Sequence, residues 1–342
     1  MRRWILKAGA VNVDGLFLEE APIPNPGPGE VRIRVHAVSL NYRDQIILTG
    51  KYGQTATEDL IPVSDGAGVI DAVGLGVDKW KVNDHVVGIY FKDWPDGPPV
   101  PGMGFGLGSN GQSGMLAEYV ILTADRVTAA PKTLSLAEAS TLPCAALTAW
   151  TALNGDRPYC IQITQGDKVL VVGTGGVSLF GLLLARAAGA DVIATSSQDD
   201  KLERVRKLGA SDTINYKKTE NWGEEAFGRT GGVQRVVNAA GGSAMDQSIA
   251  ALAFGGEVAF MGLFDQATVP PNFLVLMMKA GSIRGTSVGS AAAFVDLIQY
   301  VDAKHIKPPI DQTFAFEQVK EAYHAQASPD TFGKIVIQVA QL

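Results

Sequence analysis

A short stretch near the middle of the chain, Lys168–Ser178, constrains the fold more than any other part of the sequence. It begins with a β-branched apolar run, Val169–Val172, which suits a parallel strand buried on both faces. Glycines then interrupt the run, and the apolar residues that follow take helical spacing. This order of strand, glycine turn and helix predicts a dinucleotide-binding unit. The residues expected to cradle the pyrophosphate are Gly173, Thr174, Gly175, Gly176, Val177 and Ser178.

One position departs from the full G-x-G-x-x-G pattern, because Ser178 stands where the third glycine is expected. Serine has the next-smallest side chain that still allows a helix to pack closely on a strand. An ordinary turn between strand and helix is the alternative interpretation. The flanking strand and helix both fit nucleotide binding, so the sequence favours a phosphate cradle at the helix N-terminus.

The end of the second strand of this unit indicates which nucleotide binds. An NAD site places Asp or Glu about 20 residues beyond the first glycine, where it binds the ribose 2′-hydroxyl. This chain has Ser196 and Ser197 there, with Lys201 one helical turn further on. Hydroxyls and a cation suit a 2′-phosphate, whereas Asp199 and Asp200 suit the first turn of a helix. We therefore expect NADP(H) rather than NAD(H).

Composition excludes several classes of protein. The 342 residues carry a net charge of −6, which argues against a nucleic-acid or anionic-membrane partner. No uninterrupted apolar run is long enough to span a bilayer. Two cysteines, Cys144 and Cys160, cannot build a disulfide framework. The expected location is therefore the cytosol.

The chain divides into two kinds of pattern. Residues 1–130 contain short apolar strands separated by turn clusters, which predicts a small antiparallel, barrel-like domain. Residues 131–293 alternate strands and helices, which predicts an α/β fold with a doubly wound parallel sheet of about six strands. The tail, 294–342, is expected to return to the first domain. The loop 92–114 is rich in glycine and proline, and a loop of this length is usually functional or mobile.

Several short motifs occur in a fixed order along the whole chain: Asn41–Asp44, Asp65–Val69, Val82–Val86, Leu142–Cys144, Leu147–Trp150, Gly173–Ser178, Leu208–Ala210 and Phe332–Lys334. Together they resemble the medium-chain dehydrogenase/reductase superfamily, in its zinc-independent, quinone-oxidoreductase-like branch. The resemblance implies a GroES-like β-barrel catalytic domain and a Rossmann domain, with the active site in the cleft between them. It also implies hydride transfer to or from a nicotinamide.

Zinc-dependent relatives place a Cys near the start of the element Leu40–Asp44, a His-Glu pair at Ser64–Asp65, and a third ligand near Cys144. Asn41 and Ser64 cannot replace a thiolate and an imidazole, and a catalytic zinc needs three protein ligands. The structural zinc lobe of those relatives needs four cysteines, and the loop 92–114 has none. The sequence therefore predicts no metal, and Cys144 is expected to be a packing residue.

Without a metal, another group must polarise the substrate oxygen or protonate the product. The candidates are Asn41, Tyr42, Asp44 and Tyr52, because they carry an amide, phenols and a carboxyl group. The alternative is structural: Tyr42 as a core residue and Asp44 in an ion pair with Arg43. The four histidines are expected to be structural or exposed.

Further cofactor contacts follow from the resemblance and from the strand order. Thr148 matches a threonine that faces the nicotinamide, and Lys201 and Tyr216 match residues that hold the adenosine phosphate. For Tyr216 the alternative is a cap on the hydrophobic edge. Ligands bind at the carboxyl ends of such strands. The remaining candidates are Asn238, Gly262, Leu263, Phe264, Ser287 and Val288, with Gly333 and Lys334 from the tail.

The leading hypothesis is an NADPH-dependent reductase of an activated C=C or C=O bond in an enone, quinone or small carbonyl compound. A metal-free alcohol dehydrogenase and a non-enzymatic NADPH-binding protein are the alternatives. The resemblance also implies a homodimer, in which the last strands of two Rossmann sheets pair near Ser282–Val288.

Overall fold

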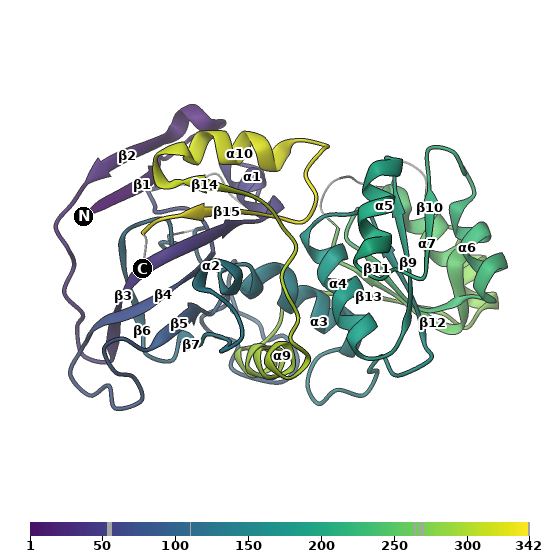
Figure 1. Ribbon diagram of the computed structural model, residues 1–342, viewed down its shortest axis with the longest axis horizontal. Coiled ribbons are helices and arrows are strands. Elements are labelled where there is room, and N and C mark those ends of the chain that lie inside the picture. Colours follow the sequence, from purple (N-terminus) through teal and green to yellow (C-terminus); the bar gives the residue numbers. More distant parts are fainter. Residues whose placement is uncertain (53–56, 110, 263–264, 266, 268–269, 341–342) are drawn as a thin grey trace. The chain divides into compact units, whose positions relative to one another are not determined.

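The computed structural model describes residues 1–52, 57–109, 111–262, 265, 267 and 270–340 (Figure 1). The chain forms two compact units. The outer unit comprises Met1–Leu147 and Gly289–Leu342, and the central unit comprises Thr148–Val288. Residues 131–147, assigned by sequence to the nucleotide domain, thus belong to the outer unit. The reason is tertiary: the backbone N–H of Cys144 donates to Asp65 Oδ2 at 3.1 Å, which ties this segment to a strand of the outer unit.

The central unit contains a parallel sheet, and it confirms the doubly wound architecture predicted from the sequence. The strand order is β10-β9-β8-β11-β12-β13, so the chain reverses direction across the sheet between β8 and β11. Ligands bind at the carboxyl ends of strands beside such a reversal. The strands are β8 (Lys168–Val172), β9 (Asp191–Ser196), β10 (Asp212–Asn215), β11 (Val233–Asn238), β12 (Leu252–Phe260) and β13 (Ser282–Gly285).

Alternate residues of these strands face two different helical layers, as the pleat requires. Leu170 and Val236 belong to a buried cluster with Trp222 of α6 and Met245 of α7. Val171 packs on the opposite side, against Gly181 of α4. The helices are α3 (Leu147–Asn154), α4 (Gly176–Ala187), α5 (Asp199–Lys207), α6 (Trp222–Thr230), the 3₁₀ turn η3 (Gly242–Ala244), α7 (Met245–Ala251) and α8 (Phe273–Met278).

The outer unit is built on a mixed sheet with the path β14-β15-β3-β4-β5-β7, in which β6 also pairs with β3. The path does not close into a barrel within the described residues. A separate antiparallel pair is formed by β1 (Arg2–Leu6) and β2 (Leu16–Glu20). The other strands are β3 (Glu30–Leu40), β4 (Asp65–Val73), β5 (His85–Gly88), β6 (Tyr119–Thr123), β7 (Val127–Ala129), β14 (Ile310–Ala315) and β15 (Lys334–Gln338).

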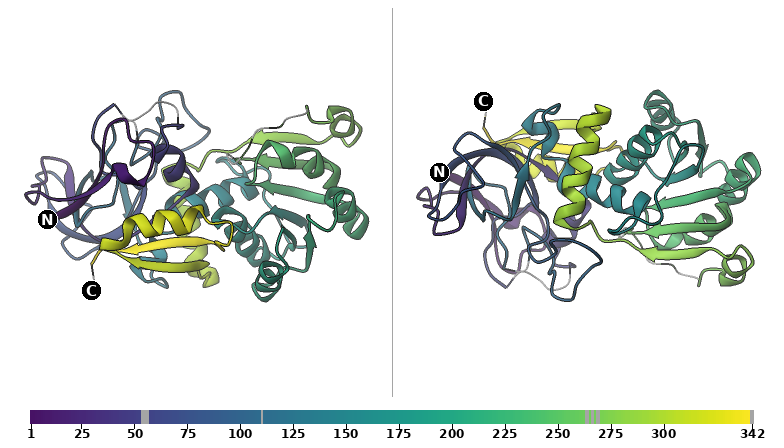
Figure 2. Two further views of the ribbon diagram at one scale, coloured as in Figure 1. Left: turned by 90° about the horizontal axis from the view of Figure 1, so that it is seen from above. Right: turned by 90° about the horizontal axis from the view of Figure 1, so that it is seen from below.

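The C-terminal segment completes this sheet, because β15 pairs antiparallel with β3 and brings Ile335 opposite Leu40. Helix α10 lies along β14 and β15, as the two views in Figure 2 show. The helical segments of the outer unit are η1 (Val13–Gly15), α1 (Tyr42–Leu48), α2 (Leu136–Ala139), the π-helical η2 (Leu142–Ala146), α9 (Ala291–Lys304), η4 (Phe316–Gln318) and α10 (Val319–Ala327). Within the described residues, no helix is both long and apolar enough to cross a membrane.

Candidate active site

The glycine turn of the central unit has the geometry of an anion cradle. Gly173 has φ +87°, a left-handed conformation that favours glycine, and its N–H donates to Thr195 Oγ1 at 3.2 Å. A Cβ on Gly175, which caps α4, would meet no heavy atom within 4 Å. The first N–H groups of α4 have no acceptor inside the helix, so they are directed toward this open space. The turn can therefore take a pyrophosphate.

Close packing between helix and strand is achieved without a third glycine. Ser178 is buried, and its hydroxyl donates to Val172 O at 2.8 Å. The tightest approach comes one turn later, where a Cβ on Gly181 would lie 3.3 Å from Val171 Cγ1. The sequence motif predicts the close helix–strand contact at position 178. In the structure both Ser178 and Gly181 contact β8.

The carboxyl ends of β9 and β10 bring together the residues proposed for the ribose phosphate. Ser196 is buried at the end of β9, and its backbone carbonyl accepts the N–H of Tyr216 at 3.1 Å. Lys201 is 7% exposed in the first turns of α5, and Ser197 is partly buried. Asp199 does not present a free carboxylate here, because it accepts from Asn215 Nδ2 at 2.6 Å and pairs with Lys218.

The other predicted strand ends have structural contacts of their own. Asn238 is buried and closes the turn after β11: its Oδ1 accepts from the N–H of Gly241 at 3.0 Å. A Cβ on Gly262 would lie 2.3 Å from Gly241 N, so two backbones meet there. Ser287 is exposed and Val288 is buried, just beyond β13. Leu263 and Phe264 lie outside the described residues.

Two predicted residues occupy helix starts. Thr148 is buried in the first turn of α3, in the central unit. Tyr42 is partly buried as the first residue of α1, in the outer unit.

A buried polar cluster occupies the outer unit where β3, β4 and β15 meet. Lys334 is 2% exposed, and its ammonium donates to Leu40 O at 2.7 Å and to Asn41 Oδ1 at 2.5 Å. The same Nζ lies 4.0 Å from a carboxylate oxygen of Asp65. Burial lowers the pKa of Lys334, and Asp65 opposes this shift. The sequence predicts Lys334 as a cofactor contact, which stays a prediction; in the structure its ammonium contacts Leu40, Asn41 and Asp65.

Asp44, a predicted catalytic carboxyl group, lies in the first turn of α1 as a buried helix cap. Its Oδ2 accepts the backbone N–H of Asn41 at 2.7 Å, and its Oδ1 lies 3.4 Å from Arg43 Nη1. Burial raises the pKa of Asp44 to about 6, against the attraction of Arg43. Its position explains α1: the carboxylate satisfies an N–H at the helix start that has no helical acceptor.

Arg43 was expected only as an ion-pair partner, and the structure gives it a larger role. The guanidinium donates to the carbonyls of Leu107 and Phe105, at 2.9 and 3.0 Å, and to Ser109 Oγ at 2.9 Å. These acceptors all belong to the glycine-rich loop 92–114. The sequence showed Arg43 between Tyr42 and Asp44, but it gave no sign that Arg43 is buried or that it binds the loop 92–114.

Tyr52 sits beside this anchor. The guanidinium of Arg43 lies 5.1 Å from the Tyr52 ring centre and 5.0 Å from that of Tyr90, which are cation–π distances. The Tyr52 ring also packs edge-on against Phe105, with centroids 5.7 Å apart. Tyr52 therefore belongs to an aromatic group that covers Arg43.

Comparison with known proteins identifies the family. Residues 27–132 match the alcohol dehydrogenase GroES-like domain, and residues 176–303 match the zinc-binding dehydrogenase family. A zinc-type alcohol dehydrogenase-like protein of Schizosaccharomyces pombe is 40% identical over 98% of this chain and 99% of its own. The chain belongs to the medium-chain dehydrogenase/reductase superfamily.

Other members of the superfamily are similar over the same length. A mitochondrial NAD(P)H oxidoreductase of Homo sapiens is 31% identical over 91% of this chain and 82% of its own. A solved structure of a candidate alcohol dehydrogenase from Sinorhizobium meliloti has a TM-score of 0.89 and 38% identity, covering 99% of this chain and 100% of that one. The protein is thus an NAD(P)-dependent oxidoreductase, and its glycine turn fits the cofactor's pyrophosphate.

The superfamily also includes enzymes that bind zinc through Cys, His, Asp or Glu side chains. Within the described ranges, no group of three or more His, Cys, Asp or Glu side chains could hold a metal ion. Burial, followed by the negative charge of Asp65, raises the pKa of the Cys144 thiol, which opposes the thiolate that zinc requires. The Lys334 ammonium beside Asp65 would also repel a cation. These residues do not fit a catalytic zinc.

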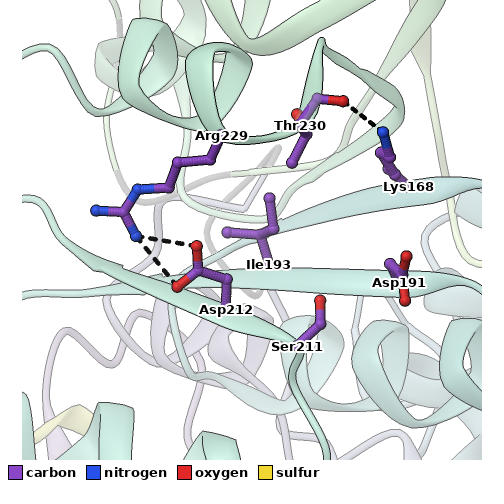
Figure 3. Close-up of a pocket in the computed structure, with 7 residues that line it drawn as sticks. All are labelled: Lys168, Asp191, Ile193, Ser211, Asp212, Arg229 and Thr230. Carbon is purple, nitrogen blue, oxygen red and sulfur yellow. Dashed lines mark hydrogen bonds and ion pairs between the residues drawn. The ribbon is translucent and has the colours of Figure 1, made fainter.

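A surface cleft of about 240 Å³ lies elsewhere on the central unit (Figure 3). It is formed at the first residues of β8, β9 and β10, the opposite edge of the sheet from the glycine turn. Within it Arg229 contacts Asp212 at 3.0 Å, and Lys168 donates to the carbonyl of Thr230. The lining residues are Lys168, Asp191, Ile193, Ser211, Asp212, Arg229 and Thr230. This cleft is separate from the cofactor turn.

Proposed function

We propose that this protein is a zinc-independent, NADPH-dependent reductase that transfers hydride to an activated C=C or C=O bond of an enone, quinone or small carbonyl compound. The observation that carries the proposal is the buried ammonium of Lys334, bonded to Asn41 and beside Asp65. Zinc-dependent relatives need metal ligands at the positions of Asn41, Ser64 and Cys144. A fixed positive charge there replaces a metal site rather than completing one.

The adenosine end supports NADPH. Ser196 and Ser197 stand where an NAD enzyme needs a carboxylate, and Lys201 follows on α5. The first acidic residue after these serines in the sequence, Asp199, is engaged by Asn215 and Lys218. A 2′-phosphate bound at the end of β9 would therefore meet hydroxyls and a cation.

Asn41 is the group in the outer unit best suited to bind the substrate oxygen. Bound NADPH supplies the hydride. If the substrate is an enone, its reduction at the β-carbon would place negative charge on the carbonyl oxygen as an enolate, and an amide N–H of Asn41 could stabilise that charge. A solvent proton then reaches the α-carbon. Asp44 is unsuited to donate this proton because it caps α1.

The test uses the purified full-length protein, dialysed against a chelator and analysed for metal. We expect less than about 0.1 zinc per chain, because a catalytic site needs three ligands. We also expect NADPH oxidation with at least one member of a panel of enones, quinones and aldehydes. One tightly held zinc per chain, with activity lost on its removal, would overturn zinc independence. Turnover of alcohols with NADP⁺ alone, or cofactor binding without turnover, would favour the two alternative functions.

We also propose a homodimer formed through the central unit. The edge strand β13 is solvent-accessible, and α8 exposes a group of apolar side chains. The exposed residues of α8 are Phe273, Leu274, Met277 and Met278, and Phe254 of β12 is exposed as well. Two-fold pairing of β13 with a second copy would satisfy its open edge and cover these side chains. Light scattering at micromolar concentration should give a dimer, and a monomer would contradict the proposal.

A further inference from the structure

The inference concerns Lys334, and it rests on the proposed function. The backbone of this lysine is held on both sides, since its N–H donates to Pro309 O at 2.8 Å and Ile335 pairs with Leu40. Gly333, immediately before it, has φ +93°, and a Cβ there would lie 2.2 Å from Pro309 O. The stem of Lys334 therefore enters the unit from a fixed position.

The ammonium decides how the Asn41 side chain is oriented. A lysine ammonium only donates hydrogen bonds, so the Asn41 atom that faces it at 2.5 Å must be the acceptor Oδ1. The amide nitrogen Nδ2 is then directed away, with Ser64 Oγ at 3.5 Å, the limit of a hydrogen bond. Ser64 gives its own proton to Asp65 Oδ1 at 2.7 Å.

Exposure separates the roles of the two residues. Asn41 keeps 8% of its surface exposed, whereas Lys334 keeps 2%, and its ammonium donates to Leu40 O and Asn41 Oδ1. Of the two residues Asn41 is the more accessible, so a ligand would meet Asn41 first and Lys334 would act through it. The weakly bound Nδ2 has a hydrogen available for a further acceptor.

We propose that Lys334 is a positioning residue, a built-in cation that locks the Asn41 amide with Nδ2 presented to the substrate oxygen. In this protein a lysine of the last strand thus provides the fixed positive charge that a metal provides in zinc-dependent relatives. Its charge acts on the substrate through one oriented amide.

The experiment compares Lys334→Met, Lys334→Met/Asp65→Asn and Lys307→Met. Lys334→Met leaves Asp65 buried without its cation, so it should unfold at a lower temperature than wild type. The double variant removes both charges and should recover most of the lost melting temperature. Its kcat should nevertheless stay about 10- to 100-fold below wild type, with KM changed less than about threefold, because the donor is misplaced mainly in the transition state. Lys307→Met, at an exposed ion pair with Glu138, should match wild type.

A second measurement does not depend on turnover. In protein labelled with ¹⁵N-asparagine, the Asn41 side-chain amide signal, identified by its loss in Asn41→Ser, should move in the double variant and stay in Lys307→Met. The inference fails if the stable double variant keeps the wild-type kcat, or if the Asn41 signal is unchanged. If wild type reduces no member of the substrate panel, the proposed function fails, while the amide signal still tests whether Lys334 holds Asn41.

Discussion

The glycine turn of the central unit and the polar cluster of the outer unit differ in whether their polar groups have partners within the protein. In the turn, the backbone N–H groups at the start of α4 face open space. A Cβ on Gly175 would meet no heavy atom there within 4 Å. The cluster does the reverse, because Lys334 and Asp44 are buried and each contacts charged or polar partners. The turn leaves its N–H groups for a ligand, whereas the charged groups of the cluster, Lys334 and Asp44, already have partners within the protein.

This difference predicts how each region responds to substitution. A change in the turn should weaken cofactor binding and leave folding almost intact, because few protein contacts depend on the open space. A change in the cluster or its neighbour Arg43 should affect folding first, because removing one partner leaves another buried group unpaired.

The largest effect is expected from Arg43→Met. The substitution removes the contacts to loop 92–114 and leaves the buried Asp44 carboxylate without its cation, so unfolding should require about 3–5 kcal/mol less. Urea unfolding measures this loss. Arg34→Met is the control, since Arg34 is partly buried and its side chain makes no hydrogen bond or ion pair within the described residues. A loss below about 1 kcal/mol would show that Arg43 is not an anchor.

The next effect depends on pH. The folded pKa of Asp44, about 6, lies above its ordinary value of 3.8, so the folded state binds the proton more tightly. Binding this proton adds about 3 kcal/mol to the free energy of unfolding below pH 4. This contribution is lost as the pH rises through the folded pKa of about 6. Asp44→Asn cannot titrate, so its stability relative to wild type should increase between pH 4 and 7. A difference that stays constant with pH would contradict the raised pKa.

Gly175→Asp tests the open side of the comparison. Its backbone, with φ −78°, accepts a side chain, but a carboxylate there would oppose the cofactor pyrophosphate. NADPH should bind about 100-fold more weakly, a cost of about 3 kcal/mol, while the melting temperature stays close to wild type. Gly228→Asp adds the same group at an exposed position of α6, where a Cβ meets nothing, and should bind NADPH normally. Unchanged affinity in Gly175→Asp would place the pyrophosphate elsewhere.

The smallest expected effect tests the preference for NADPH over NADH. Lys201→Ala should weaken the binding of NADPH about tenfold and that of NADH much less, because only the 2′-phosphate of NADPH receives the charge-assisted contact. Ser196→Asp should invert the preference by adding repulsion. Dissociation constants for both cofactors measure the ratio, which a general loss of stability does not alter. Lys207→Ala, exposed at the end of α5, is the control. Equal binding of NADH and NADPH by wild type would contradict the assignment.

Local patterns in the sequence were enough to determine the parallel sheet, the glycine turn and the family. Such features depend on residues adjacent in the chain, whose spacing records strand, turn and helix directly. Short strands were harder: β2 has mostly exposed or partly exposed residues, and β7 spans Val127–Ala129, so neither shows a clear alternation. The segment 131–147 was assigned to the nucleotide domain because its helical pattern can be read from neighbouring residues. Its attachment to β4 depends on Asp65, 79 residues away from Cys144, and leaves no such pattern.

Only the tertiary structure decided what the charged side chains do. Lys334 and Asn41 are separated by 293 positions in the chain and meet because β15 pairs with β3. Arg43 was visible in its motif, but its acceptors, including Ser109, lie 62 to 66 residues away in a loop without periodicity. Sequence spacing carries no information about such partners, because burial and hydrogen bonding depend on which distant segments the fold brings together.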